Sequence, residues 1–181
     1  MDTTKGHRYL TVSAHGRPAA LTAPPVFRDR PQPLTNTTQT PSLAGYTVLL
    51  VGRSQPDMRQ MSIWVDGFGG VGVNTAMGKT ALDWLAQPTR GRAMVVVDGD
   101  DIGDAEEVVD FGYALRKVAP DAPVILLSSF FKRNDFTSER MLICDASLRN
   151  PVSLVTFKLG VAAALQNHQI YQRAVRPALR A

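Results

Sequence analysis

The sequence predicts an α/β domain with a doubly wound, five-stranded parallel sheet and helices on both faces. From Gly45 onward, short runs of Val, Leu and Ile alternate with segments whose apolar residues recur at helical spacing. The apolar runs are continuous, as is typical of parallel strands that helices bury on both faces. A chain of 181 residues with 44% hydrophobic content is long enough to bury such a core.

Five β-α units follow one another along this part of the chain. The expected strands cover residues 46–51, 71–73, 93–98, 122–128 and 146–149. The expected helices cover residues 56–65, 79–87, 105–118 and 135–143, and a final helix runs from about residue 150 past 165. Asn150 and Pro151 suit the start of that final helix, as a capping residue and a first-turn proline.

The chain is expected to have three parts. Residues 1–44 are rich in Thr and Pro and show no periodicity, which predicts a flexible tail, and residues 45–166 hold the domain. The basic residues of the tail are scattered, which favours a solvated linker over an arm that binds nucleic acid. Residues 167–181 form either a tail or a helical extension that binds a partner or a second copy of the chain.

Composition narrows the function classes. The net charge of +4 is small, so we expect no nucleic-acid partner. The apolar stretches fall far short of the roughly 20 residues needed to cross a bilayer, so we expect no membrane span. The single cysteine, Cys144, excludes an internal disulfide and favours a reducing compartment, so we expect a cytoplasmic protein. The common hydrolase, nucleotide and redox motifs are missing, so we do not expect an enzyme.

Polar residues stand where three of the expected strands end. Asp98 follows a buried run of valines, Ser128 ends the fourth strand and Asn150 follows the fifth. In a doubly wound sheet, ligands and chemistry gather at the carboxyl ends of the strands. We therefore expect these three side chains to lie at one rim of the sheet.

This constellation resembles the receiver domain of bacterial two-component response regulators, over roughly residues 46–165. The spacings between Asp98, Ser128 and Asn150 match that family, as do the stretches "AMGKTALDWL" and "LRNPVSL". In the family, the aspartate that ends the third strand accepts a phosphoryl group, a Ser or Thr ending the fourth strand senses it, and a Lys before a Pro pairs with it. The resemblance implies the flavodoxin-like strand order 2-1-3-4-5 and makes Asp98 the phosphoacceptor candidate.

The sequence departs from the family at the charged positions. Gly52, Arg53 and Ser54 replace the acidic pair that holds Mg²⁺ in receivers, and Asn150 replaces the lysine. Phosphoryl transfer needs charge neutralised on the phosphoryl oxygens, which Mg²⁺ and the lysine supply in the family. We therefore expect a pseudo-receiver that is not phosphorylated at Asp98 and needs no cofactor.

Two further residues stand beside the phosphate site in this alignment. Arg149 precedes the position of the lysine, and Ser147 takes the place where many receivers carry an aromatic residue. Arg149 or Arg53 could clamp a phosphate as a bidentate donor.

The carboxylates near Asp98 leave two alternatives open. Asp100, Asp101 and Asp57 could rebuild a Mg²⁺ shell from the other side of the site. Alternatively, Arg53 could pair permanently with Asp98 and lock the site without phosphate.

The expected function is that of an atypical stand-alone receiver, which acts in signal transduction through protein–protein contacts. The expected contact face comprises the helix at 135–143, the strand at 146–149 and the last helix. The resemblance implies a protein partner such as a histidine kinase, a phosphotransfer protein or a regulator, and a homodimer is an open possibility. The alternative is a small flavodoxin-like ligand-binding protein or enzyme that uses the crevice at the strand ends.

Overall fold

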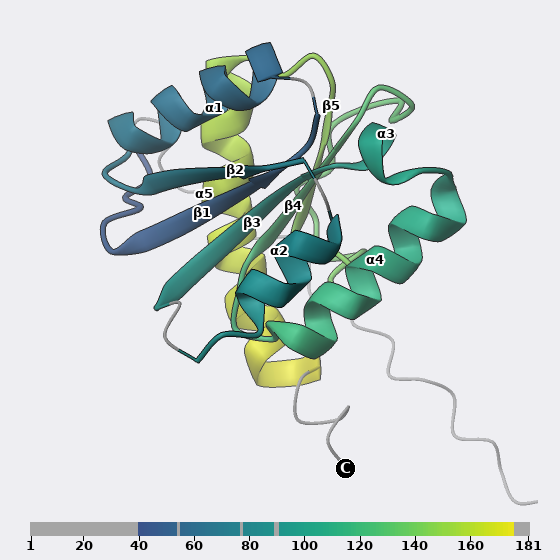
Figure 1. Ribbon diagram of the computed structural model, residues 1–181. Helices are drawn as coiled ribbons and strands as arrows, with labels where there is room; N and C mark the ends of the chain where they lie inside the picture. Colours follow the sequence, from purple (N-terminus) through teal and green to yellow (C-terminus); the bar gives the residue numbers. More distant parts are fainter. Residues whose placement is uncertain (1–39, 54, 77, 89–90, 176–181) are drawn as a thin grey trace, which may run out of the picture. The chain divides into compact units, whose positions relative to one another are not determined.

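The computed structural model describes residues 40–53, 55–76, 78–88 and 91–175 of the chain. All five strands are parallel and follow the order β2-β1-β3-β4-β5, so the predicted topology is confirmed (Figure 1). The strands are β1 (Tyr46–Val51), β2 (Val71–Thr75), β3 (Arg92–Asp98), β4 (Val124–Ser128) and β5 (Ala146–Arg149). The helices are α1 (Gln55–Gly67), α2 (Gly78–Leu85), α3 (Gly99–Ile102), α4 (Ala105–Val118) and α5 (Leu154–Ile170), and a π-helical turn η1 (Tyr171–Val175) follows α5.

Helices cover both faces of the sheet, and each face has its own apolar core (Figure 1). Val96 of β3 lies in the core beneath α1 and α5, whereas its neighbours Val95 and Val97 lie in the core beneath α2 and α4. Successive strand residues point to opposite faces, so a strand buried on both sides must be apolar throughout. No helix in the described segments is long and apolar enough to cross a membrane.

The domain begins earlier than the expected boundary at residue 45. Leu43 is fully buried, and its backbone N–H donates to the carbonyl of Phe68 at 2.8 Å. Residues 1–39, which hold most of the expected flexible tail, lie outside the described residues.

The domain also ends later than the expected boundary at residue 166. Tyr171 is 2% exposed, and the guanidinium of Arg116 lies 4.3 Å from the centre of its ring. The amide of Asn167 donates to the carbonyl of Asp145 at 2.7 Å. The end of α5 and the start of η1 therefore belong to the packed domain, and Tyr171 is not available for a contact with a second copy.

A buried polar network explains this C-terminal packing. Arg116 of α4 and Asp145, just before β5, form an ion pair at 2.8 Å with side chains 4% and 0% exposed. Nδ1 of His168 lies 3.3 Å from the other oxygen of Asp145, which also accepts from the backbone N–H of Val124 at 2.7 Å. His168 is buried, because α5 continues to Ile170 and carries its side chain into this network.

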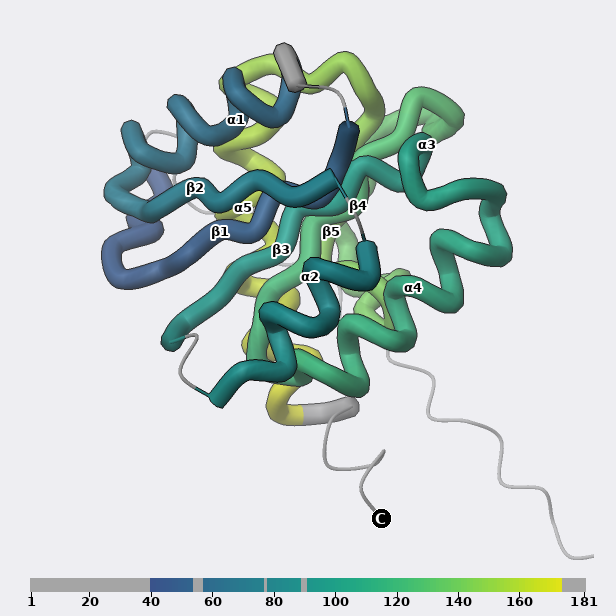
Figure 2. The backbone as a smooth tube through the Cα atoms, in the orientation of Figure 1, coloured from purple at the N-terminus to yellow at the C-terminus, as the bar shows by residue number. Residues whose placement is uncertain are grey.

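The expected helix at residues 135–143 does not form. Asp135 exchanges two backbone hydrogen bonds with Ser147, of 2.7 and 2.9 Å, so it lies extended beside β5. Its carboxylate accepts from both the backbone N–H and the hydroxyl of Thr137, at 2.9 and 2.7 Å, and this local bonding favours a turn over a helix. The segment from Ser129 to Asp145, which we name the β4–β5 loop, therefore lacks a helix, and Figure 2 shows it as an irregular tube beside α3.

The last helix starts three residues later than expected. Ser153 is its N-cap and accepts from the backbone N–H of Thr156 at 3.2 Å. Asn150 lies three residues before this cap, and its side-chain amide faces Asp98 instead. Asn150 is thereby left at the rim of the sheet.

Candidate functional site

Asp98 ends β3 and lies almost entirely inside the protein, with 5% of its surface exposed. Its carboxylate caps the short helix α3, accepting from the backbone N–H of Asp100 at 3.2 Å. The same oxygen faces the side-chain amide of Asn150 at 3.4 Å. Asp98 and Asn150 therefore lie beside each other at the rim of the sheet, as expected from the sequence. The hydrogen bond between the amide and the carboxylate is long and therefore weak.

The surroundings of Asp98 oppose its negative charge. The pKa of Asp98 is raised from 3.8 to about 6, chiefly by burial. The hydrogen bond from the N–H of Asp100 acts against this shift, and the charges of Asp101, Asp100 and Asp57 add to it. A phosphoryl group at this carboxylate would add more negative charge to the same place.

Ser128 lies at the expected rim but is turned toward Asp100 rather than Asp98. Its hydroxyl donates to Oδ1 of Asp100 at 2.5 Å, and the backbone N–H of Ser129 donates to Oδ2 at 2.8 Å. Burial alone would raise the pKa of Asp100, but the bonds from Ser128 and Ser129 outweigh it and hold this pKa below its usual value. Asp100 is thus a charged group that ties α3 to the end of β4.

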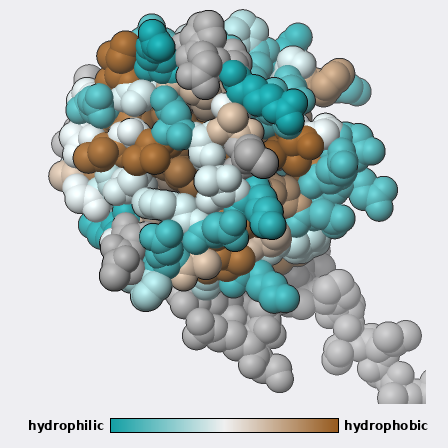
Figure 3. All heavy atoms as spheres, in the orientation of Figure 1, coloured by the Kyte–Doolittle hydropathy of each residue, from teal (hydrophilic) through white to brown (hydrophobic). Residues whose placement is uncertain are grey.

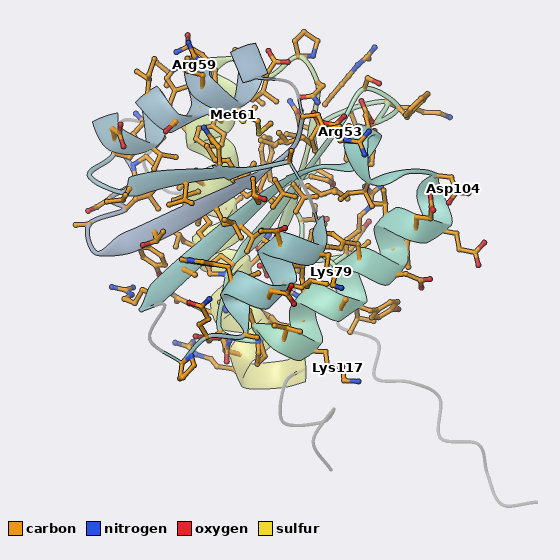
Figure 4. The ribbon with its side chains drawn as sticks, in the orientation of Figure 1. Arg53, Arg59, Met61, Lys79, Asp104 and Lys117 are labelled. Carbon is orange, nitrogen blue, oxygen red and sulfur yellow. The ribbon has the colours of Figure 1, made fainter. Side chains whose placement is uncertain are left out.

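Arg53 does not neutralise Asp98. Its backbone N–H donates to the carboxylate of Asp101 at 2.5 Å, while its side chain is exposed (Figure 4). Within the described residues no ion pair joins Arg53 to Asp98, so the hypothesis of a permanent Arg53–Asp98 lock is wrong. Ser54, its neighbour in the same corner, lies outside the described residues.

Gly52 fills the corner in which receivers carry acidic residues. A Cβ added there would lie 3.1 Å from the Cβ of Asp98 and 3.2 Å from the terminal methyl of Met58. Such approaches are closer than ordinary van der Waals contact, so the backbone at Gly52, directly after β1, packs against Asp98. A carboxylate at residue 52 would have to displace one of these neighbours.

The donor groups do not fit a Mg²⁺ site. Asp100 is engaged by Ser128 and Ser129, and Asp101 by the N–H of Arg53. In the part of the chain that the structure describes, no three His, Cys, Asp or Glu side chains converge as metal ligands. Asp57 is exposed on α1 and acts on Asp98 only through its charge.

Arg149 and Ser147 are engaged away from Asp98. The guanidinium of Arg149 donates to the carbonyl of Lys132 at 3.3 Å, so it lies over the β4–β5 loop. Ser147 is buried and accepts from Nη1 of Arg140 at 3.0 Å. Among the described residues, neither of them forms a hydrogen bond or ion pair with the carboxylate of Asp98. That Arg149 could clamp a phosphate stays a prediction.

A pocket of about 500 Å³ opens where the expected helix is missing, between α4 and the β4–β5 loop. Its wall is mainly apolar and includes Val108, Leu126, Phe131 and Ile143, with Ser128 and Asp100 at one side. This pocket was not predicted from the sequence. The run of polar residues from Lys132 to Asp135, which is typical of a loop, was the signal that could have indicated it.

Comparison with solved structures identifies the fold. A response regulator receiver domain protein from Clostridium thermocellum matches 69% of this chain and 98% of its own, with 13% identity and a TM-score of 0.53. A response regulator from Thermotoga maritima matches 67% of this chain and 98% of its own, with 16% identity and a TM-score of 0.54. A receiver protein from Burkholderia phymatum matches 66% and 94%, with 20% identity and a TM-score of 0.52. No family model and no curated protein matches the sequence. At these identities the comparison shows the fold alone: the chain has the fold of a response-regulator receiver domain.

Proposed function

We propose that this protein is an atypical receiver that takes part in signal transduction by binding partner proteins and is not phosphorylated at Asp98. One observation carries the proposal: among the described residues, the charged groups that shift the pKa of Asp98 are all carboxylates. Phosphoryl transfer to a carboxylate requires positive charge at the transferred group. Here the lysine of the family is the uncharged Asn150, and the Mg²⁺ corner is the glycine backbone at Gly52.

The packing around Asp98 supports the same proposal. The carboxylate is 5% exposed, and one of its oxygens already accepts from Asp100 and faces Asn150. A phosphodonor would have to displace these contacts before its phosphorus reached the nucleophile. The domain accordingly acts as a surface for contact with a histidine kinase, a phosphotransfer protein or another regulator, and not as an enzyme.

The proposal is tested by incubating the protein with acetyl phosphate and Mg²⁺ and weighing it intact. We expect an unmodified mass for the wild type. The matched control is Asp66→Ala, which removes an exposed carboxylate near the C-terminal end of α1. A stoichiometric phosphoryl adduct that persists in Asp66→Ala and is lost in Asp98→Ala would overturn the proposal.

A second candidate function, the binding of a small organic molecule, is favoured by the pocket beside β4. A volume of about 500 Å³ is within the range of ligand sites. A nucleotide does not suit it, because Asp104 already caps the neighbouring helix N-terminus, accepting from the N–H groups of Glu106 and Glu107. A bound molecule detected by native mass spectrometry of freshly purified protein would support this candidate.

A further inference from the structure

The pocket beside α4 has an exposed apolar rim that extends beyond the cavity. Phe130 is 85% exposed and Val109 is 37% exposed, and both line the pocket. Tyr113, one helical turn after Val109, is 50% exposed. A large aromatic side chain that is left in solvent next to a cavity is typical of a protein-binding surface.

On the side of α4, the rim is bordered by acidic residues, whereas the exposed Lys132 and Arg133 follow Phe131 on the side of the loop. Residues 93–115 contain no Lys, Arg or His, and Asp104, Glu106 and Asp110 are all exposed on the first turns of α4. Figure 3 shows hydrophilic residues gathered over this side of the molecule with a smaller hydrophobic area beside them. The cation that lines the pocket, Arg140, is already engaged by Ser147 and lies over the ring of Phe131 at 5.3 Å.

Helix capping explains only part of this acidity. Asp104 and Glu107 form a capping box, with bonds of 2.9 and 3.0 Å in its two directions. Glu106 and Asp110 lie outside the box and are four residues apart, a spacing at which like charges repel each other on one helix face. No described Lys or Arg forms an ion pair with either of them. A cationic partner would relieve this repulsion.

We propose that the pocket, its rim and its acidic border bind a segment of a partner protein that carries a large apolar side chain flanked by lysine or arginine. The apolar side chain enters the pocket between Val108 and Phe131, and the basic side chains lie over Glu106 and Asp110. A small molecule inside the cavity would leave Tyr113, which does not line the pocket, uncovered. The acidic border repels the phosphates of a nucleic acid. This inference rests on the proposed function as an interaction module and names its contact surface.

The test is a selection from a phage-displayed random peptide library on the intact wild-type protein. A selected peptide is then synthesised, and its Kd is measured by fluorescence anisotropy at low and high salt. We expect an aromatic or large aliphatic residue next to Lys or Arg in the selected peptides. We also expect weaker binding at high salt, because exposed charges are screened.

Two matched variants locate the binding site. Val109→Arg should weaken binding by about tenfold or more, because it places a cation at the edge of the pocket. Val155→Arg changes an equally small residue, 66% exposed at the start of α5, and should leave the Kd unchanged. The double variant Glu106→Gln and Asp110→Asn should remove most of the salt dependence, and thermal unfolding checks that each variant folds.

Three results would overturn the proposal of this binding surface. The selection could enrich no peptide, it could enrich acidic peptides, or Val109→Arg could leave the Kd of the selected peptide unchanged. Loss of binding in Val155→Arg alone would move the interaction to α5 and overturn the surface while leaving the proposed function intact. A phosphoryl adduct at Asp98 would overturn the proposed function without bearing on the peptide measurements.

Discussion

Ser128 donates its hydroxyl hydrogen to Asp100 at 2.5 Å and not to Asp98, although Ser128 and Asp98 end neighbouring strands. The bond joins α3 to β4 and holds Asp100 in its charged form. It also leaves Asp98 without the hydroxyl contact that a phosphate-sensing serine would provide. The polar residues of this rim are therefore arranged to stabilise a loop and a short helix.

Ser128→Ala should destabilise the protein by about 1–3 kcal/mol, because it leaves a charged carboxylate with one fewer hydrogen bond. The measurement is urea unfolding at neutral pH. Ser138→Ala is the control, since the hydrogen bond recorded for Ser138 is made by its backbone carbonyl, and it should change the unfolding free energy by less than about 0.5 kcal/mol. Equal effects of the two substitutions would contradict this role of Ser128.

Asp98→Asn should stabilise the protein above pH 6. The pKa of Asp98 is raised from 3.8 to about 6 in the folded state, so the folded protein keeps this proton longer than the unfolded chain does. The contribution of Asp98 to wild-type stability should therefore fall as pH rises from about 4 to about 6 and then level off. Asn retains the oxygen that accepts from Asp100, so the variant should gain up to roughly 3 kcal/mol over the wild type at pH 7.

The check is the difference in unfolding free energy between wild type and Asp98→Asn at several pH values. The difference isolates Asp98 from the other carboxylates, which titrate in both proteins. A difference that stays constant from pH 4 to pH 7 would show that Asp98 is not perturbed by its surroundings.

Asp145→Ala should cost about 3–5 kcal/mol, because it leaves the guanidinium of Arg116 buried without its partner charge. Chemical denaturation measures the loss. Asp110→Ala is the control, because Asp110 is exposed and should change stability by no more than about 0.5 kcal/mol. A small effect at Asp145 would mean that the network does not hold α4, β5 and α5 together.

Gly112→Ala should destabilise the protein even though alanine favours helix. The added Cβ would lie 2.6 Å from the Cβ of Ile143, at the place where α4 packs against the β4–β5 loop. Overpacking costs about 1–3 kcal/mol, which exceeds the roughly 1 kcal/mol that alanine gains in a helix. Gly67→Ala at the end of α1 is the control: nothing lies within 4 Å of its added Cβ, so thermal unfolding should show no loss.

The sequence predicted the sheet well because strand burial leaves a strong local signal. A run such as Val95 to Val97 followed by Asp98 indicates both the buried strand and the polar residue at its end. The repetition of this pattern was enough to predict parallel pairing, and the resemblance to receivers supplied the strand order. The start of a helix was predicted most accurately where the sequence contains a recognisable capping residue, as at Asp104, the N-cap of α4.

The sequence predicted the β4–β5 loop and the buried network poorly because both depend on distant partners. The helix expected at 135–143 does not form, because Asp135 makes backbone hydrogen bonds with Ser147. No local sequence pattern indicates this pairing. Arg116, Asp145 and His168 come from three separate elements and meet only in the folded chain. The pocket follows from the missing helix, so it could not be predicted while that helix was expected.

The central claim is that Asp98 is a buried carboxylate that no cation of the described residues neutralises. The most direct test is an NMR titration of its side-chain carboxyl carbon, with and without Mg²⁺. We predict a pKa of about 6 that Mg²⁺ leaves unchanged. A pKa at or below 3.8, or one that falls when Mg²⁺ is added, would contradict the account.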